Sequence, residues 1–156
     1  MINYIFILFG EIELARKMTE EEMLKFLAEG TKTGKLATVR KNGKPHTVPI
    51  WFVINHKNLV FTTMNTSIKA RNILNYPYVA LTVDDQTPPY SFVTIEGKAK
   101  ILDTTDEEKL KWTTKIAERY MGVDLAESFG KRNAVPEEYL VSISMDKVIA
   151  YWNVSE

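Results

Sequence analysis

The sequence predicts a mainly β protein with peripheral helices, an α+β fold whose strands form an antiparallel barrel. Two observations carry this prediction. Five strand-like segments follow one another with short turns between residues 36 and 102, and the helical patterns are short or lie outside this run. Residues 91–102 alternate apolar and polar side chains, which is typical of an antiparallel strand with one exposed face.

Helix signals mark four segments. Capping boxes, in which a threonine precedes a glutamate by three residues, begin helices at Thr19 and Thr105. Gly30 and Gly122 supply the stop signals of these two helices. The other two helices are expected from Ser67 to a stop at Pro77 and over residues 125–132.

Strands are expected over residues 36–40, 46–54, 59–61, 78–84, 91–102, 139–145 and 148–152. Asn42 and Gly43 predict a type I′ hairpin turn between the first two strands, because this turn needs positive φ at both central residues. The nearly continuous apolar character of residues 46–54 indicates a strand covered on both faces. The last two strands are expected to pair as a hairpin over Asp146 and Lys147.

The composition excludes several classes of function. The 156 residues include 20 Lys plus Arg and 20 Asp plus Glu, so the net charge is zero and any anion site must be local. We therefore expect no nucleic-acid or membrane partner. The chain has no cysteine and only two histidines, which argues against disulfides, thiolate nucleophiles and metal sites.

The N-terminus is unusually apolar. Residues 1–9 read MINYIFILF, which is far shorter than the ~20 residues of a membrane span. The segment also lacks the basic region and cleavage site of a signal peptide. We expect residues 1–17 to be an extension that covers apolar surface as a strand or short helix, residues 18–156 to form one domain, and the protein to be cytoplasmic.

The segment of residues 59–77 carries the strongest functional signal. An apolar strand leads into Thr62 and Thr63, and a turn then opens a helix at Ser67. Lys69 and Arg71 follow within about one turn. Hydroxyl groups, unpaired N–H groups at a helix start and two cations are the chemistry of a phosphate site. The alternative is a capped surface helix with solvated cations.

Pro49 interrupts the second strand. Proline cannot donate a hydrogen bond to a strand ladder, so this point should lie at an edge or a bulge. The freed backbone groups could then contact a flat ligand. A structural kink without any ligand is the equal alternative.

No catalytic constellation of side chains is visible. The sequence has no G-x-S-x-G, P-loop, G-x-G-x-x-G or metal-spacing motif. Asp84 and Asp85 are neighbours in a strand and point to opposite faces. His46 is expected to be exposed, His56 lies in a turn, and neither has a partner that the sequence reveals. The catalytic residues remain unknown, which makes sense if a cofactor carries the chemistry.

Several motifs, taken in order, resemble the pyridoxamine 5′-phosphate oxidase-like, flavin-binding split-barrel family. They are a LATV strand, an NGKPH turn, a TVPIWF strand, FTT, S-x-K-x-R-N, NYPYVAL and an EG-centred strand. The resemblance implies an FMN-binding split barrel. It also implies a homodimer, with two flavin sites at the subunit interface and partner-side contacts at Trp152 and the Tyr90 region.

The same resemblance implies the binding residues. Thr62, Thr63, Ser67 and Lys69 match positions that hold the flavin phosphate, and Arg71 matches a cation beside it. The flavin ring is expected along Pro49, Ile50 and Trp51, contacted mainly through the backbone.

The chain departs from the family pattern at its end. True pyridoxamine 5′-phosphate oxidases carry an arginine-rich C-terminal segment, whereas this chain has no arginine after Arg132. The leading hypothesis is therefore an FMN-dependent oxidoreductase that passes hydride or electrons from NAD(P)H to an unknown small molecule. The K-x-R-N motif also fits relatives that use the deazaflavin coenzyme F-420. A third hypothesis is a flavin- or haem-binding protein without turnover.

Overall fold

The computed structural model describes residues 15–155, which form nine strands and four helices. The strands are Arg16–Lys17 (β1), Gly34–Val39 (β2), Pro45–Ile50 (β3), Val53–Asn55 (β4), Asn58–Met64 (β5), Tyr78–Asp85 (β6), Ser91–Ile101 (β7), Glu138–Ser144 (β8) and Lys147–Trp152 (β9). The helices are Glu20–Ala28 (α1), Ile68–Asn75 (α2), Asp106–Met121 (α3) and Val123–Asn133 (α4).

The strands form a curled antiparallel sheet in the order β3-β2-β6-β7-β8-β5-β4. The small strand β1 pairs with β9, which pairs in turn with β7. Strands β3 and β4 are the two ends of the main order, yet only Trp51 and Phe52 separate them in the chain. These two residues therefore carry the chain across the open seam, and the predicted antiparallel split barrel is confirmed.

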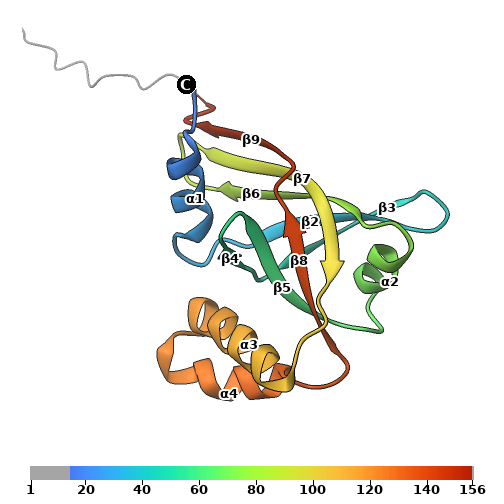
Figure 1. The fold of residues 1–156 in the computed structure, drawn as a ribbon. Coiled ribbons are helices and arrows are strands. Elements are labelled where there is room, and N and C mark those ends of the chain that lie inside the picture. Colours follow the sequence, from blue (N-terminus) through green and yellow to red (C-terminus); the bar gives the residue numbers. More distant parts are fainter. Residues whose placement is uncertain (1–14, 156) are drawn as a thin grey trace, which may run out of the picture.

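Figure 1 shows how the helices surround the sheet: α1 and α2 lie at opposite sides, and α3 and α4 pack together beneath β5. The two expected capping boxes are present. Thr19 Oγ1 accepts a hydrogen bond from Glu22 N at 3.2 Å, and the Glu22 carboxylate accepts one from Thr19 N at 2.8 Å. Thr105 and Glu108 make the same reciprocal pair at the start of α3. None of the helices within residues 15–155 has the length and apolar character needed to cross a bilayer.

The core has two parts. The larger part fills the barrel, and its largest fully buried side chains include Phe26, Leu36, Phe52, Phe61, Leu81 and Ile95. The smaller part lies under α3 and contains Val53, Val60, Ile116 and Leu140. Strand β5 contributes to both, with Phe61 inside the barrel and Val60 against α3. Burial of each such side chain stabilises the fold by about 1.5–3 kcal/mol.

The prediction of one covered strand over residues 46–54 is wrong. The chain leaves the sheet after Ile50 and enters it again at Val53, so the apolar run spans the seam of the barrel. Strand β3 is an edge strand with mostly exposed or half-buried side chains. Pro49 lies in it, opposite Lys35, and the prediction of an edge position for Pro49 is confirmed.

The prediction of a type I′ turn is also wrong. Gly43 N donates to Arg40 O at 2.8 Å, and Arg40 N donates to Lys44 O at 2.9 Å. Within this turn only Gly43 has positive φ, at 82°. The loop therefore has three residues and a left-handed glycine, the second common way to close a hairpin.

The last two strands do not form a hairpin. Strand β8 pairs with Ala99–Ile101 of β7, and β9 pairs with Phe92–Glu96 of the same strand, so they lie one after the other along β7. Gly97 marks the step between them. A Cβ atom at Gly97 would overlap the carbonyl oxygen of Ser144. The hairpin prediction failed because β8 and β9 each pair with the long strand β7 and not with each other.

The predicted extension is described only in part. Residues 1–14 lie outside the described residues, so the expectation for MINYIFILF is not tested. The next residues form β1, where Arg16 pairs with Trp152 and Lys17 with Tyr151.

Candidate functional site

The strand-turn-helix unit around Ser67 has the predicted local structure. Strand β5 ends at Met64, and Ser67 is the N-cap of α2. Ser67 Oγ accepts a hydrogen bond from Ala70 N at 3.2 Å and lies 2.8 Å from Thr63 Oγ1. This pair of hydroxyls fixes the end of the strand against the start of the helix. The first N–H groups of α2 and its positive dipole end point out of this turn.

A hollow of about 470 Å³ opens beside the turn, and its walls come from β5, α2, α4 and β8. Figure 1 shows the chain running from the end of β5 into α2, and from α4 into β8. The polar lining residues are Thr62, Thr63, Ser67, Lys69, Arg132, Asn133 and Glu138. The structure thus brings together four of the predicted binding residues and adds three that the sequence did not reveal.

Lys69 is the central cation of this hollow. Its side chain is half-buried, and within residues 15–155 its Nζ makes no hydrogen bond and no direct ion pair. Burial lowers the pKa of Lys69, and the charge of Glu138 acts in the opposite direction. A half-buried ammonium group without a direct partner favours an anionic ligand, because an uncompensated charge in such a place is costly.

Glu138 is the most unexpected member of the site. It is only 9% exposed and lies at the start of β8, in register with Met64 of β5. Burial raises the pKa of Glu138, while a hydrogen bond from the Thr62 side chain and the charges of Lys69 and Lys109 lower it. No local pattern could reveal Glu138, since its place depends on the register between β5 and β8, and the paired residues Met64 and Glu138 are 74 positions apart in the sequence.

Arg71 lies on a different side of α2. Its side chain is exposed, and Nη2 donates a hydrogen bond to Thr66 O at 2.9 Å. It lines a second hollow together with Arg40 and Lys41. Lys69 and Arg71 therefore do not converge on one point, because residues two apart on a helix project in different directions.

Asn72, the last residue of the K-x-R-N motif, has a structural place. It is buried, and its amide Nδ2 donates to Thr38 Oγ1 of β2 at 2.9 Å. Thr38 Oγ1 lies 3.4 Å from the carbonyl oxygen of His46. These contacts hold α2 against the β2–β3 hairpin and thereby fix where Lys69 points.

The predicted ring-binding residues lie at the seam of the barrel. Pro49 is exposed on β3, Ile50 is buried in the core, and Trp51 is 38% exposed. The Trp51 indole stacks on the Tyr120 ring, with 4.9 Å between centroids and 1° between the planes. Pro49 and Trp51 thus offer an apolar surface beside an edge whose backbone groups are not all paired within the sheet.

Side chains of α3 hold the seam. Phe52 N donates to Tyr120 Oη at 3.2 Å, and Tyr120 Oη donates to Lys32 O at 2.9 Å. Arg119 donates to the carbonyl oxygens of Leu27, Gly30 and Phe52. Burial raises the pKa of Tyr120 and lowers that of Arg119. The backbone groups of Phe52 are therefore already bonded, whereas β3 pairs within residues 15–155 only with β2 and keeps the backbone groups of its outer edge for a ligand.

The remaining titratable candidates have ordinary surroundings. Asp84 Oδ1 pairs with Lys35 Nζ at 2.6 Å, and Asp85 accepts a hydrogen bond from Thr87 N at 2.9 Å. His56 lies in the turn between β4 and β5 with a φ of 54°. His46 is half-buried rather than exposed, because it packs beside Arg40. Across the described part of the chain, no group of three or more His, Cys, Asp or Glu residues could hold a metal ion.

A sequence profile of the pyridoxamine 5′-phosphate oxidase family matches residues 19–150, from the cap of α1 into β9. The chain belongs to this family. The family match covers the seam and all four elements that line the hollow around Lys69, so the resemblance seen in the sequence motifs is confirmed. The family match identifies the family of the chain but assigns no substrate.

Several known proteins are similar to this pyridoxamine 5′-phosphate oxidase family member. A 5a,11a-dehydrotetracycline/5a,11a-dehydrooxytetracycline reductase from Streptomyces rimosus is 33% identical over 99 residues, which cover 58% of this chain and 68% of that protein. A conserved hypothetical protein from Mycobacterium tuberculosis has a similar structure, with a TM-score of 0.74, 25% identity and coverage of 87% and 85% of the two chains. An F-420 reductase gives a TM-score of 0.61, 25% identity and coverage of 80% and 94%.

Proposed function

We propose that this protein is an FMN-dependent oxidoreductase whose flavin phosphate binds in the hollow around Lys69. The observation that carries the proposal is a half-buried Lys69 ammonium group without a direct partner, beside the hydroxyls of Thr63 and Ser67 and the start of α2. This set of donors suits a phosphate group. Family membership supports the flavin as the molecule that carries the phosphate.

The proposal assigns the phosphate and the flat ring of the flavin to two groups of residues. Thr62, Thr63, Ser67 and Lys69 would hold the phosphate, with Lys69 supplying the charge. Pro49, Ile50 and Trp51 would position the ring along the edge of β3. For Arg71 we propose an indirect part: it holds the turn before α2 through Thr66 O and adds positive potential.

The protein's own contribution is binding and orientation. A bound flavin supplies the capacity to accept and pass on hydride or electrons, here from NAD(P)H to a small-molecule acceptor. The stacked pair of Trp51 and Tyr120 gives the edge of β3 a fixed position, and the hydroxyl of Tyr120 ties that edge to α3. Pyridoxamine 5′-phosphate oxidase activity itself is not proposed, since no arginine follows Arg132 in the sequence.

The second candidate is a reductase that uses the deazaflavin coenzyme F-420. The similarity to an F-420 reductase and the K-x-R-N motif favour it. The basic hollow formed by Arg40, Lys41 and Arg71, on the far side of α2, would suit a ligand with additional negative charges.

Purified protein tests both candidates. FMN-dependent function predicts a bound yellow ligand with the absorbance and mass of FMN, near one per chain, that NAD(P)H bleaches. Binding of deazaflavin with no affinity for FMN would replace the first candidate by the second. Tight FMN binding without bleaching by any reduced nicotinamide would indicate a flavin-binding protein without turnover.

We also propose a homodimer with the flavin site near the subunit interface. Five of the large exposed apolar side chains in the described part of the chain lie close to α2: Met64, Ile68, Leu74, Tyr76 and Tyr78. Large apolar side chains left exposed within one segment of the chain, residues 64–78, support an interaction surface there. Sedimentation at micromolar concentration should give twice the mass of the 17.9 kDa chain, and a monomer alone would refute this proposal.

A further inference from the structure

Glu138 lies in the hollow that is proposed to bind an anion, which is an unfavourable place for a carboxylate. The residue is 9% exposed, and charged or polar groups of four neighbouring elements either interact with it or line the same hollow. These groups are Thr62 on β5, Lys69 on α2, Lys109 on α3, and Arg132 and Asn133 on α4. Among them Thr62 makes a hydrogen bond to the carboxylate, and Lys69 and Lys109 act on it through charge.

An anion that enters this hollow changes the balance of charge around Glu138. Lys69 then has a second negative group to compensate, and two buried negative groups lie in one space. Like charges in a poorly solvated site disfavour the ionised form of both. The carboxyl group can relieve the conflict because, once protonated, it becomes a hydrogen-bond donor.

We propose that Glu138 takes up one proton from solvent when an oxoanion binds in this hollow, and that its carboxylic acid then donates a hydrogen bond to the anion. The proposal rests on the proposed function in that the oxoanion is the flavin phosphate. Glu138 thereby becomes a specificity-determining residue: its acid form binds a group with accepting oxygens, and its ionised form repels the same group. Burial raises the pKa of Glu138 in the free protein, which favours the protonated form and agrees with this role.

The direction of the pH dependence follows from linkage. If binding takes up a proton, the affinity for the anion falls as pH rises above the pKa of Glu138 in the free protein, which burial holds above the ordinary glutamate value. The fall is at most about tenfold per pH unit for one proton. Deprotonation of Lys69 would also weaken binding at higher pH. The contribution of Glu138 must therefore be isolated by comparison with a variant that cannot titrate at this position.

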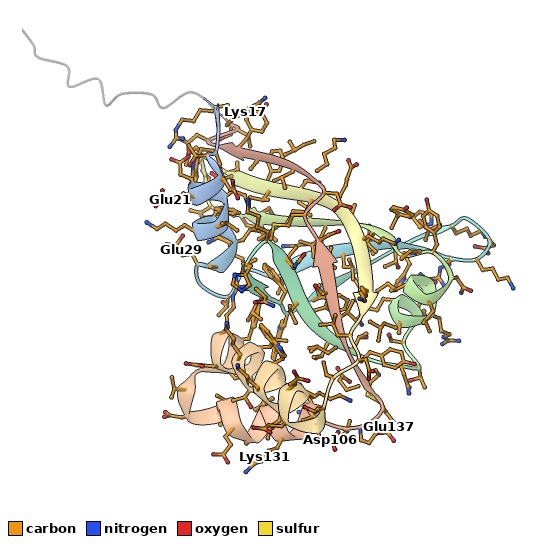
Figure 2. The ribbon with its side chains drawn as sticks, in the orientation of Figure 1. Lys17, Glu21, Glu29, Asp106, Lys131 and Glu137 are labelled. Carbon is orange, nitrogen blue, oxygen red and sulfur yellow. The ribbon has the colours of Figure 1, made fainter. Side chains whose placement is uncertain are left out.

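The test measures sulfate binding by the wild type, Glu138→Gln and Glu137→Gln. Sulfate keeps the same charge throughout the range, so only groups of the protein can take up protons. Glu137 is the matched control because it is exposed at the neighbouring position, where the chain leads into β8 (Figure 2). Calorimetry in two buffers of different ionisation enthalpy counts the protons, and amide NMR shifts at Thr63 and Ser67 locate the site.

Between about pH 5 and about pH 8, we expect the wild type and Glu137→Gln to take up more protons on sulfate binding than Glu138→Gln, with a difference that approaches about one proton. Relative to Glu138→Gln, the wild type should lose sulfate affinity progressively across this range. Equal proton uptake and parallel pH profiles in the wild type and Glu138→Gln would overturn the proposal. Circular dichroism of both variants establishes that they are folded.

FMN titrations of the same proteins separate this inference from the proposed function. If sulfate binding shows the proton uptake but FMN does not bind, the flavin assignment fails and the role of Glu138 stands. If FMN binds with the same pH profile to the wild type and to Glu138→Gln, the role of Glu138 fails and the flavin assignment stands. A protein that binds neither ligand refutes both.

Discussion

The indole ring of Trp51 lies parallel to the phenol ring of Tyr120, with 4.9 Å between the centroids. Trp51 is one of the two residues that cross the seam of the barrel. Tyr120 is in α3, which lies outside the barrel. The contact therefore joins the helical layer to the open edge of the sheet. Because Tyr120 also bonds Phe52 N and Lys32 O, one side chain fixes the path of the chain at the proposed ring site.

Replacing Tyr120 with phenylalanine should destabilise the protein by about 1–3 kcal/mol, the cost of leaving a buried donor unsatisfied. Phe52 is fully buried, so its N–H group would lose its acceptor, while the ring stacking on Trp51 would remain. Urea unfolding measures the change. Tyr151→Phe is the control, because the Tyr151 hydroxyl makes no hydrogen bond within residues 15–155. Equal unfolding midpoints for the two variants would refute the prediction.

Pro49→Val and Ile50→Ala should separate ligand binding from stability. Ile50 is 5% exposed in the core, so its truncation should cost about 2–5 kcal/mol of stability. Pro49 is exposed on the edge strand β3. Valine at this position would restore a backbone N–H donor and so change the hydrogen-bonding groups that the edge presents. FMN titrations of the folded variants should show the larger loss of affinity for Pro49→Val. A larger loss for Ile50→Ala would mean that side chains, rather than backbone groups, recognise the ring.

Glu22 should make stability depend on acid pH. Two hydrogen bonds from Arg16 and one from Thr19 N lower its pKa from 4.5 to about 2. Because the folded-state pKa is depressed, the stabilisation is complete above about pH 4.5 and is lost as pH falls toward about 2.

Denaturant unfolding of Glu22→Gln measures this dependence, since glutamine keeps the capping geometry and removes the charge. The stability difference between the wild type and Glu22→Gln should shrink as pH falls through this range. Glu21→Gln, at an exposed neighbouring position, should follow the wild type. A difference that is constant with pH would show that the carboxylate charge does not matter.

Local signals predicted the local structure well. The T-x-x-E boxes, the cap at Ser67 and the stop at Gly122 each depend on residues within one or two helical turns, and all three are present. The cluster of Thr62, Thr63, Ser67 and Lys69 could be predicted for the same reason, since a strand, a turn and a helix start bring them together.

Features set by long-range pairing could not be predicted in this way. The sequence of β8 and β9 predicts a hairpin, yet each of these strands pairs with the eleven-residue strand β7. Glu138 and Tyr120 enter the site through strand register and helix packing, with no motif of their own. Arg71 shared the motif with Lys69 but projects to the other side of α2, because helix geometry separates residues two apart.

The central claim is that Lys69 binds the phosphate of a flavin. The most direct measurement is a titration of wild type and Lys69→Ala with FMN and with riboflavin, which lacks the phosphate, using Lys111→Ala at an exposed position of α3 as the control. Loss of a hydrogen bond to a charged group should weaken FMN binding by about 1.5–3 kcal/mol, or roughly ten- to 150-fold. Riboflavin binding should stay unchanged in both variants. Equal FMN dissociation constants for the wild type and Lys69→Ala would contradict the account.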